Sequence, residues 1–97
     1  MAKIGVVASR FDIAKEFVDR LVGDISLKEL DYFVDSHYIN RYEVHFKNGD
    51  VYNAIHSSRQ LRGSKFDKLY IHLHTNKEDL KENVGPLTSH SIEYFIL

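Results

Sequence analysis

Cysteine is absent from the 97-residue sequence, and this absence excludes two classes of site. The chain can form neither a disulfide framework nor a zinc or redox centre built on thiolates. A chain without cysteine also fits a reducing compartment, so we expect this protein to work in the cytoplasm.

Long apolar runs and a surplus of charge are missing as well. The longest apolar run, Ile4–Ala8, is far shorter than the roughly 20 residues of a membrane-spanning helix, and no signal-peptide core follows Met1. Thirteen basic residues nearly balance fourteen acidic ones, which leaves a net charge of −1. General binders of nucleic acid or anionic membranes are usually basic, so we expect no membrane contact and only a local basic patch.

The residues that are present are typical of one globular domain over residues 1–97. Hydrophobic residues make up 43% of the chain, and Phe and Tyr occur six times each. A chain of this size buries roughly 60–70% of the surface that it exposes when unfolded, so a single core is feasible.

The first third of the chain predicts a strand and a helix. Lys3–Ala8 is a continuous apolar run that suits a strand covered on both faces. Ser9 and Asp12 form a short capping box, and Gly23 ends the helix after Val22. The apolar residues between them fall on one helical stripe: Phe11, Ala14, Phe17, Val18 and Leu21.

The segment after Gly23 is ambiguous. A second capping-box pattern at Ser26–Glu29 predicts a short second helix reaching Val34, although its aromatic residues leave an extended conformation open. Asp35–Asn40 then reads as a polar connector.

The middle of the chain predicts a β-hairpin. Side chains alternate between apolar and polar in Tyr42–Phe46 and again in Val51–Ile55. Between them, Gly49 supplies the positive φ of a tight turn, which Asn48 also tolerates.

The last third predicts a strand, a helix and a strand. The strand is Lys68–His74, and the helix begins at Thr75 or Asn76 and stops at Gly85-Pro86. The final strand is Ser91–Leu97. The resulting order, β-α-(α)-β-β-β-α-β, predicts a small mixed-sheet α/β sandwich.

Several short motifs occur in an order that resembles a known family. The matching residues are Val6-Val7-Ala8, Ala14 and Phe17, then Asn48-Gly49-Asp50 after Phe46, then Arg62-Gly63 and Phe66-Asp67 before an apolar strand. In this order the chain resembles part of the ATPase domain of phage terminase large subunits, which are helicase-like P-loop proteins that package DNA.

The catalytic residues of that family are missing. No Gly-x-x-x-x-Gly-Lys-Ser/Thr phosphate loop occurs, and the strand that should end in Asp-Glu ends in His72-Leu73-His74. Neutral imidazoles do not replace hard carboxylate ligands for magnesium. The resemblance therefore implies a phage or prophage protein of the host cytoplasm that needs no cofactor and acts by binding. An alternative is a structural subunit that complements a larger packaging motor.

A basic loop is the candidate ligand site. Arg59, Arg62, Lys65 and Lys68 surround Gly63, whose small size would let backbone approach a phosphate closely. We expect the partner of this chain to be either a protein or a phosphate-bearing ligand, and the phosphate-bearing ligand would bind at this loop. The plain alternative is a solvated surface loop between strands.

Histidines offer a second, enzymatic hypothesis. His72 and His74 have a metal-ligand spacing, and a site would be completed by His45, His56 or His90. A phosphoesterase would instead use His56, His72 and His74 as acid and base. The alternative is that these imidazoles are solvent-exposed or hydrogen-bonded without a function.

The final strand suggests self-association. If Ser91–Leu97 lies at a sheet edge, its backbone groups would pair with another chain, as in a homodimer. The alternative is an edge strand that is already paired inside the monomer.

Overall fold

The computed structural model describes residues 2–23, 25, 27–36, 38–59, 66–81 and 91–97. Its elements, in chain order, are β1 (Lys3–Ala8), α1 (Phe11–Val22), a 3-10 turn (Leu27–Glu29), β2 (Leu30–Ser36), β3 (Arg41–Phe46), β4 (Val51–His56), β5 (Lys68–His72), α2 (Lys77–Asp79) and β6 (Ser91–Phe95).

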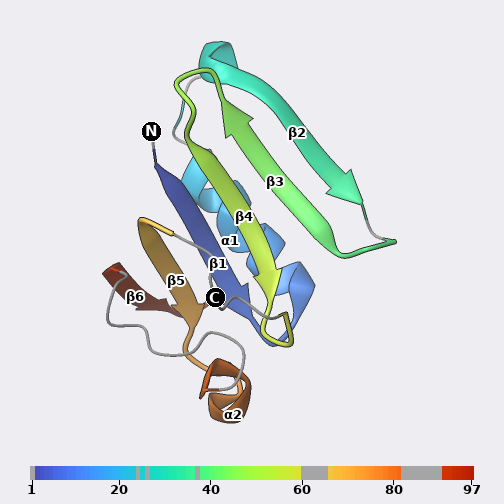
Figure 1. The fold of residues 1–97 in the computed structure, drawn as a ribbon, viewed down its shortest axis with the longest axis vertical. Coiled ribbons are helices and arrows are strands. Elements are labelled where there is room, and N and C mark those ends of the chain that lie inside the picture. Colours follow the sequence, from blue (N-terminus) through green and yellow to red (C-terminus); the bar gives the residue numbers. More distant parts are fainter. Residues whose placement is uncertain (1, 24, 26, 37, 60–65, 82–90) are drawn as a thin grey trace.

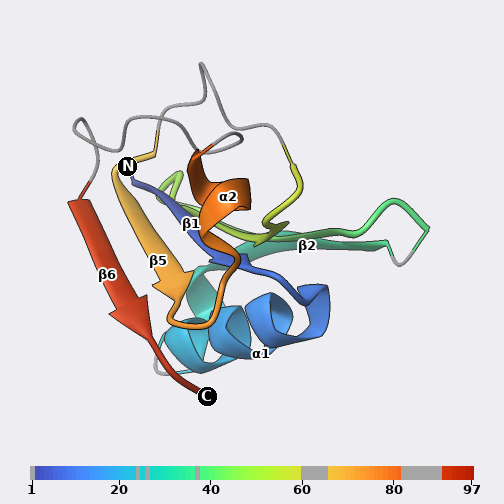
Figure 2. The same ribbon diagram turned by 90° about the horizontal axis from the view of Figure 1, so that it is seen from below.

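The strands form one mixed sheet in the order β2-β3-β4-β1-β5-β6 (Figure 1). Strand β3 runs antiparallel to β2 and β4, whereas β1 is parallel to β4 and β5, and β5 is parallel to β6. Helix α1 covers one face, and the short α2 lies on the other (Figure 2). The predicted mixed-sheet α/β architecture is therefore confirmed.

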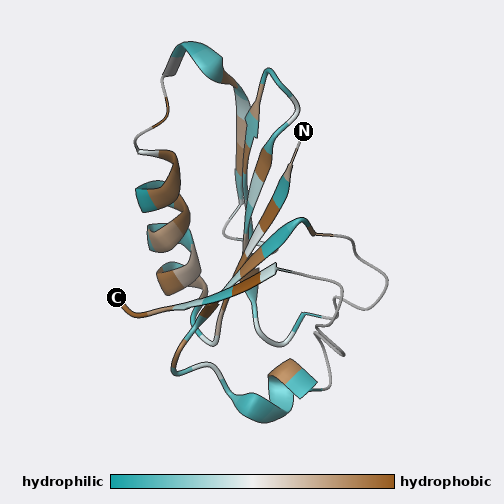
Figure 3. Cartoon of the chain, turned by 90° about the vertical axis from the view of Figure 1, so that its left-hand side faces the viewer, coloured by the Kyte–Doolittle hydropathy of each residue, from teal (hydrophilic) through white to brown (hydrophobic). Residues whose placement is uncertain are grey.

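The core has two parts because β1 is buried on both faces. Val6 and Ala8 face α1 and pack with Ala14 and Val18, while Val7 faces the opposite side. The opposite cluster is completed by Ile55, Phe66, Leu69 and Ile71. Burial of each large side chain in such a cluster contributes about 1.5–3 kcal/mol. Figure 3 shows the hydrophobic colouring along the strands and the neighbouring α1.

Strand β6 forms one edge of the sheet and ends at Phe95, before the predicted end of the last strand at Leu97. The Phe95 ring stacks on Phe17 of α1 with centroids 3.8 Å apart and an interplanar angle of 3°. An edge strand paired on one side only is thereby fixed to the α1 layer.

The hairpin between β3 and β4 is confirmed. Gly49 has a φ of 94°, a conformation that glycine adopts without strain. The Asn48 side-chain oxygen accepts a hydrogen bond from the Asp50 backbone N–H at 2.9 Å, and the Gly49 N–H donates to the Phe46 carbonyl at 3.0 Å.

The predicted second helix is wrong. Only the 3-10 turn Leu27–Glu29 forms, and Leu30–Ser36 is strand β2, so Asp35 and Ser36 belong to a strand rather than to a connector. The aromatic and β-branched side chains of Tyr32, Phe33 and Val34 favour a strand, and pairing with β3 supplies the backbone partners. Tertiary pairing therefore outweighs the capping pattern.

The helix caps are partly as predicted. The box of Ser9 and Asp12 is wrong: Arg10 is the N-cap, it makes no capping hydrogen bond with described residues, and its guanidinium pairs with Asp12 at 2.8 Å. Gly23 does follow the end of α1. Asn76 caps α2, since its side-chain oxygen accepts from the N–H groups of the second and third residues that follow it.

The late elements are shorter than predicted. Strand β5 ends at His72, which leaves His74 in the following turn. The predicted stop of the second helix at Gly85-Pro86 lies outside the described residues. None of the helices in the described ranges has the length and apolar character needed to cross a membrane.

Candidate functional site

The structure describes two residues of the predicted basic loop. Arg59 follows β4 and Lys68 begins β5, whereas Arg62, Gly63 and Lys65 lie outside the described residues. The loop as a phosphate site therefore stays a prediction, and only its two ends can be placed.

Lys68 faces the α1 side of the sheet. Lys68 pairs with Ile4 of β1, and Ile4 lies on the same face of the sheet as Val6, which packs in the core cluster beneath α1. The Lys68 ammonium pairs with Glu93 of β6 at 2.9 Å and lies 4.6 Å from the Tyr70 ring centroid. Hydrogen bonds to Glu93 and Tyr70 raise the pKa of Lys68. This lysine connects β5 to β6.

Arg59 lies toward the opposite face. It lines a cavity with Ile55 and Phe66, which belong to the core cluster away from α1. Arg59 and Lys68 are thus separated by the sheet. A single small ligand would not meet both.

The predicted histidine set is only partly brought together. The rings of His72 and His74 lie 5.5 Å apart, but His72 is 6% exposed and packs edge-on against Phe95. Burial, and then the neighbouring His74, lowers the pKa of His72, so its imidazole is held neutral. A largely buried imidazole whose neutral form is favoured is poorly placed for acid–base chemistry.

A metal site is not formed by the described side chains. Nowhere in these ranges do three or more His, Asp or Glu groups gather around one point. The Nε2 atom of His45 is hydrogen-bonded to Glu43 Oε1, also on β3, at 2.9 Å. His90 lies outside the described residues. The metal and phosphoesterase alternatives therefore gain no geometric support from the described part of the chain.

His56 serves the turn after β4. Its Nδ1 accepts a hydrogen bond from the Ser58 backbone N–H at 3.1 Å and lies 2.7 Å from the Ser58 hydroxyl. The Arg59 N–H donates to the His56 carbonyl at 2.9 Å. His56 therefore fixes the turn from which Arg59 extends.

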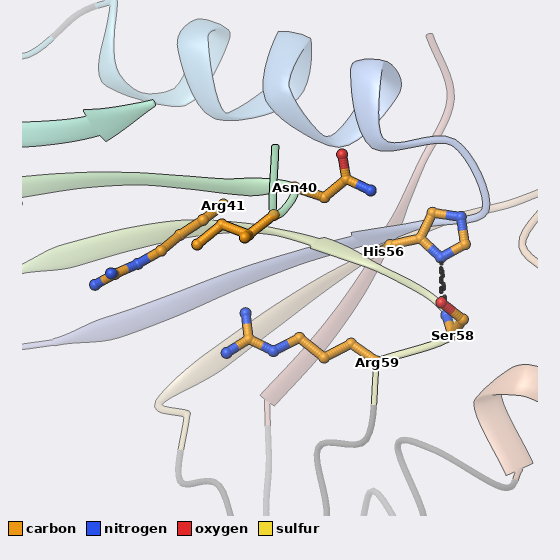
Figure 4. Close-up of a pocket in the computed structure, with 6 residues that line it drawn as sticks. Asn40, Arg41, His56, Ser58 and Arg59 are labelled. Carbon is orange, nitrogen blue, oxygen red and sulfur yellow. Dashed lines mark hydrogen bonds between the residues drawn. The ribbon is translucent and has the colours of Figure 1, made fainter. Parts of the chain in front are cut away.

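A pocket of about 450 Å³ opens at this turn (Figure 4). It is lined by Ile39, Asn40, Arg41, His56, Ser58 and Arg59. The size falls within the roughly 300–1,000 Å³ of small-ligand sites. The lining brings the turn between β2 and β3 against the segment that follows β4.

The two arginines give the pocket its chemistry. Arg41 donates from Nε to Glu43 Oε2, and this bond and charge raise the pKa of Arg41. Burial favours the neutral form of Glu43, but hydrogen bonds from Arg41 and His45 outweigh it and lower the pKa of Glu43. Within the described part of the chain, no ion pair involves Arg59. Figure 4 shows the Arg41 and Arg59 side chains extending in the same direction along the sheet.

The sequence did not reveal Asn40, Arg41 or Ser58 as site residues. Strand register brings them together: Tyr42 pairs with Ala54, so the residues preceding Tyr42 come level with those following Ala54. Asn40 turns the chain there with a φ of 48°, a left-handed value that Asn tolerates. Asn40 and Arg41 are ordinary polar residues at the start of a strand, and nothing in a single sequence indicates that they lie beside the turn after β4.

Comparison of the chain with protein-family models, with curated proteins and with solved structures found no match.

Proposed function

We propose that this chain is a small binding protein that takes a phosphate-bearing ligand in the pocket around Arg41 and Arg59. The observation that supports this most is that two arginines line one pocket, which is also lined by the amide-bearing Asn40 and the hydroxyl-bearing Ser58. Guanidinium groups match phosphate oxygens in charge and planar geometry.

The ligand is an anion because the local carboxylate is already engaged. Glu43 accepts from both Arg41 and His45, so it orients the arginine while neutralising only part of the positive charge. A second positive group, Arg59, remains to attract the ligand. The net charge of −1 limits attraction for long polyanions and favours a small ligand.

Binding without catalysis is the mode that we propose. The sequence has no phosphate loop and no acidic pair after β5, where His72 ends the strand. If the terminase resemblance reflects descent, the chain is a phage-type relative that keeps the domain's framework without its hydrolytic residues. Magnesium-dependent cleavage of ATP by the purified chain would contradict this proposal.

The test is an NMR titration of the isotope-labelled protein with ribose 5-phosphate in low salt. We expect the amide signals of Asn40, Ser58 and Arg59 to shift together. Arg59→Gln should weaken binding by about 10- to 100-fold, since a hydrogen bond to a charged group contributes about 1.5–3 kcal/mol. Added salt should weaken binding in the wild type as well.

Arg20→Gln is the matched control. It removes the same charge from an exposed side chain on α1 whose partner is Glu16, away from the pocket. Equal affinities for the Arg59→Gln and Arg20→Gln variants would refute the site.

A second candidate function, assembly with another chain through β6, rests on exposed edge residues. Tyr94 is 58% and Ile96 63% exposed at this edge of the sheet. A partner strand, from a second copy or from a larger motor subunit, would extend the sheet there. Sedimentation at rising protein concentration tests the homodimer, and a Tyr94→Lys variant should reduce any association.

A further inference from the structure

A second cavity adjoins the Arg59 pocket on the sheet face opposite α1. It measures about 260 Å³, and its polar lining comes from Lys3, Glu43, His45, Asn53 and Arg59. Arg59 lines both cavities. Glu43, which lines the second cavity, accepts a hydrogen bond from Arg41, which lines the Arg59 pocket. The two cavities therefore share one arginine and are joined by an ion pair.

Asn53 has an unmet hydrogen-bonding requirement. Its side-chain Oδ1 is buried and has no hydrogen-bond partner among the described residues. Asn53 alternates with Ile55 along β4, so its side chain faces the cavity side of the sheet. A buried acceptor without a partner costs about 1–3 kcal/mol, and a rotation that turned the Asn53 amide toward the cavity would let an N–H donor of a ligand recover this energy.

The surroundings of Asn53 suit a flat, partly apolar group. His45 stacks on Tyr32 with ring centroids 4.2 Å apart, and it contributes an aromatic wall. The buried Phe66 also lines the cavity, and the Lys3 ammonium lies 4.7 Å from the centroid of its ring. Ligand sites commonly combine aromatic walls with a few polar groups that fix the orientation of the ligand.

The amide of Asn53 narrows the chemical class further. An asparagine side chain presents an acceptor beside a donor, which is complementary to a base edge that presents N–H next to a ring nitrogen, as adenine does. We infer that the ligand of this protein is a free adenine nucleotide, with its phosphate at Arg41 and Arg59 and its base over Asn53. This inference rests on the proposed phosphate site and adds the class of ligand that fills it.

The test compares AMP, ribose 5-phosphate and adenosine by NMR titration of the full chain. AMP should bind about tenfold more tightly than ribose 5-phosphate, and only AMP and adenosine should shift the Asn53 side-chain amide signals. This second readout needs no variant, so it remains informative if a substitution impairs folding.

Asn53→Val tests the role of the amide, because valine is favoured in strands and lacks both hydrogen-bonding atoms of asparagine. We expect the variant to bind AMP no better than ribose 5-phosphate and to bind ribose 5-phosphate as the wild type does. Lys68→Gln, on the other face of the sheet, should change neither affinity.

The contrary results separate the two proposals. Equal affinities for AMP and ribose 5-phosphate, unaffected by Asn53→Val, would overturn the nucleotide inference and leave the phosphate site standing. Failure of all three compounds to bind would overturn both. An oligo-dA strand that binds many-fold more tightly than AMP would replace the free nucleotide with single-stranded nucleic acid.

Discussion

Gly5 of β1 lies where the sheet leaves no room for a side chain. A Cβ at this position would lie 2.7 Å from Leu69 Cδ2, 3.0 Å from Phe66 Cε1 and 3.1 Å from Ile55 Cδ1. These three side chains belong to the core cluster opposite α1 and are at most 8% exposed, so they cannot swing into solvent. We therefore expect Gly5→Ala to overpack this core.

The magnitude follows from two opposing effects. Overpacking of a well-filled core costs about 1–3 kcal/mol. Replacement of glycine by alanine also restricts the unfolded chain and recovers about 0.4–1 kcal/mol. The net loss in the free energy of unfolding should be about 1–2 kcal/mol. For a domain of this size, that loss lowers the melting temperature by about 4–16 °C.

The assay is urea unfolding followed by circular dichroism, together with a thermal scan. Leu69→Val removes the atom that a new Cβ would meet first, so Gly5→Ala should cost less in that background than in the wild type. A Gly5→Ala protein as stable as the wild type, or strictly additive costs in the double variant, would refute the close-packing argument.

Three further predictions concern the turn and two titratable groups. Gly49→Ala places a Cβ at a φ of 94° and should lower the free energy of unfolding by about 1–2 kcal/mol in urea unfolding, with an unchanged β3–β4 register by NMR. Burial, and then the hydrogen bond that Tyr42 donates to Asp19, raises the pKa of Tyr42 above its usual 10.0. The stabilisation that this protonated tyrosine gives the folded state is thus complete below pH 10 and is lost at higher pH. The free energy of unfolding of the wild type should therefore fall above about pH 10, and that of Tyr42→Phe should fall less. The pKa of His72 is lowered below 6.5 by burial and by His74. The neutral imidazole therefore stabilises the folded state above that pH, and this stabilisation is lost as the pH falls. Urea midpoints should therefore drop between about pH 7.5 and pH 5, and an equal drop in His72→Leu would contradict this assignment.

Local patterns in the sequence determined the parts of the fold that need no distant partner. The apolar run of β1, the helical stripe of α1 and the Asn48-Gly49 turn each depend on residues within a few positions of one another. Backbone sterics and the spacing of apolar residues act over that range, so these elements could be predicted.

Tertiary structure decided the rest. Leu30–Ser36 carries a capping pattern, but pairing with β3 makes it a strand because the sheet supplies backbone hydrogen bonds and a surface for its aromatic side chains. Register brings Asn40 and Arg41 to the turn after β4, and the sheet separates Lys68, on the α1 side, from Arg59, which lines a cavity on the opposite side. Contacts between residues far apart in the chain depend on which strands are neighbours and which faces are buried, and no short stretch of sequence contains that information.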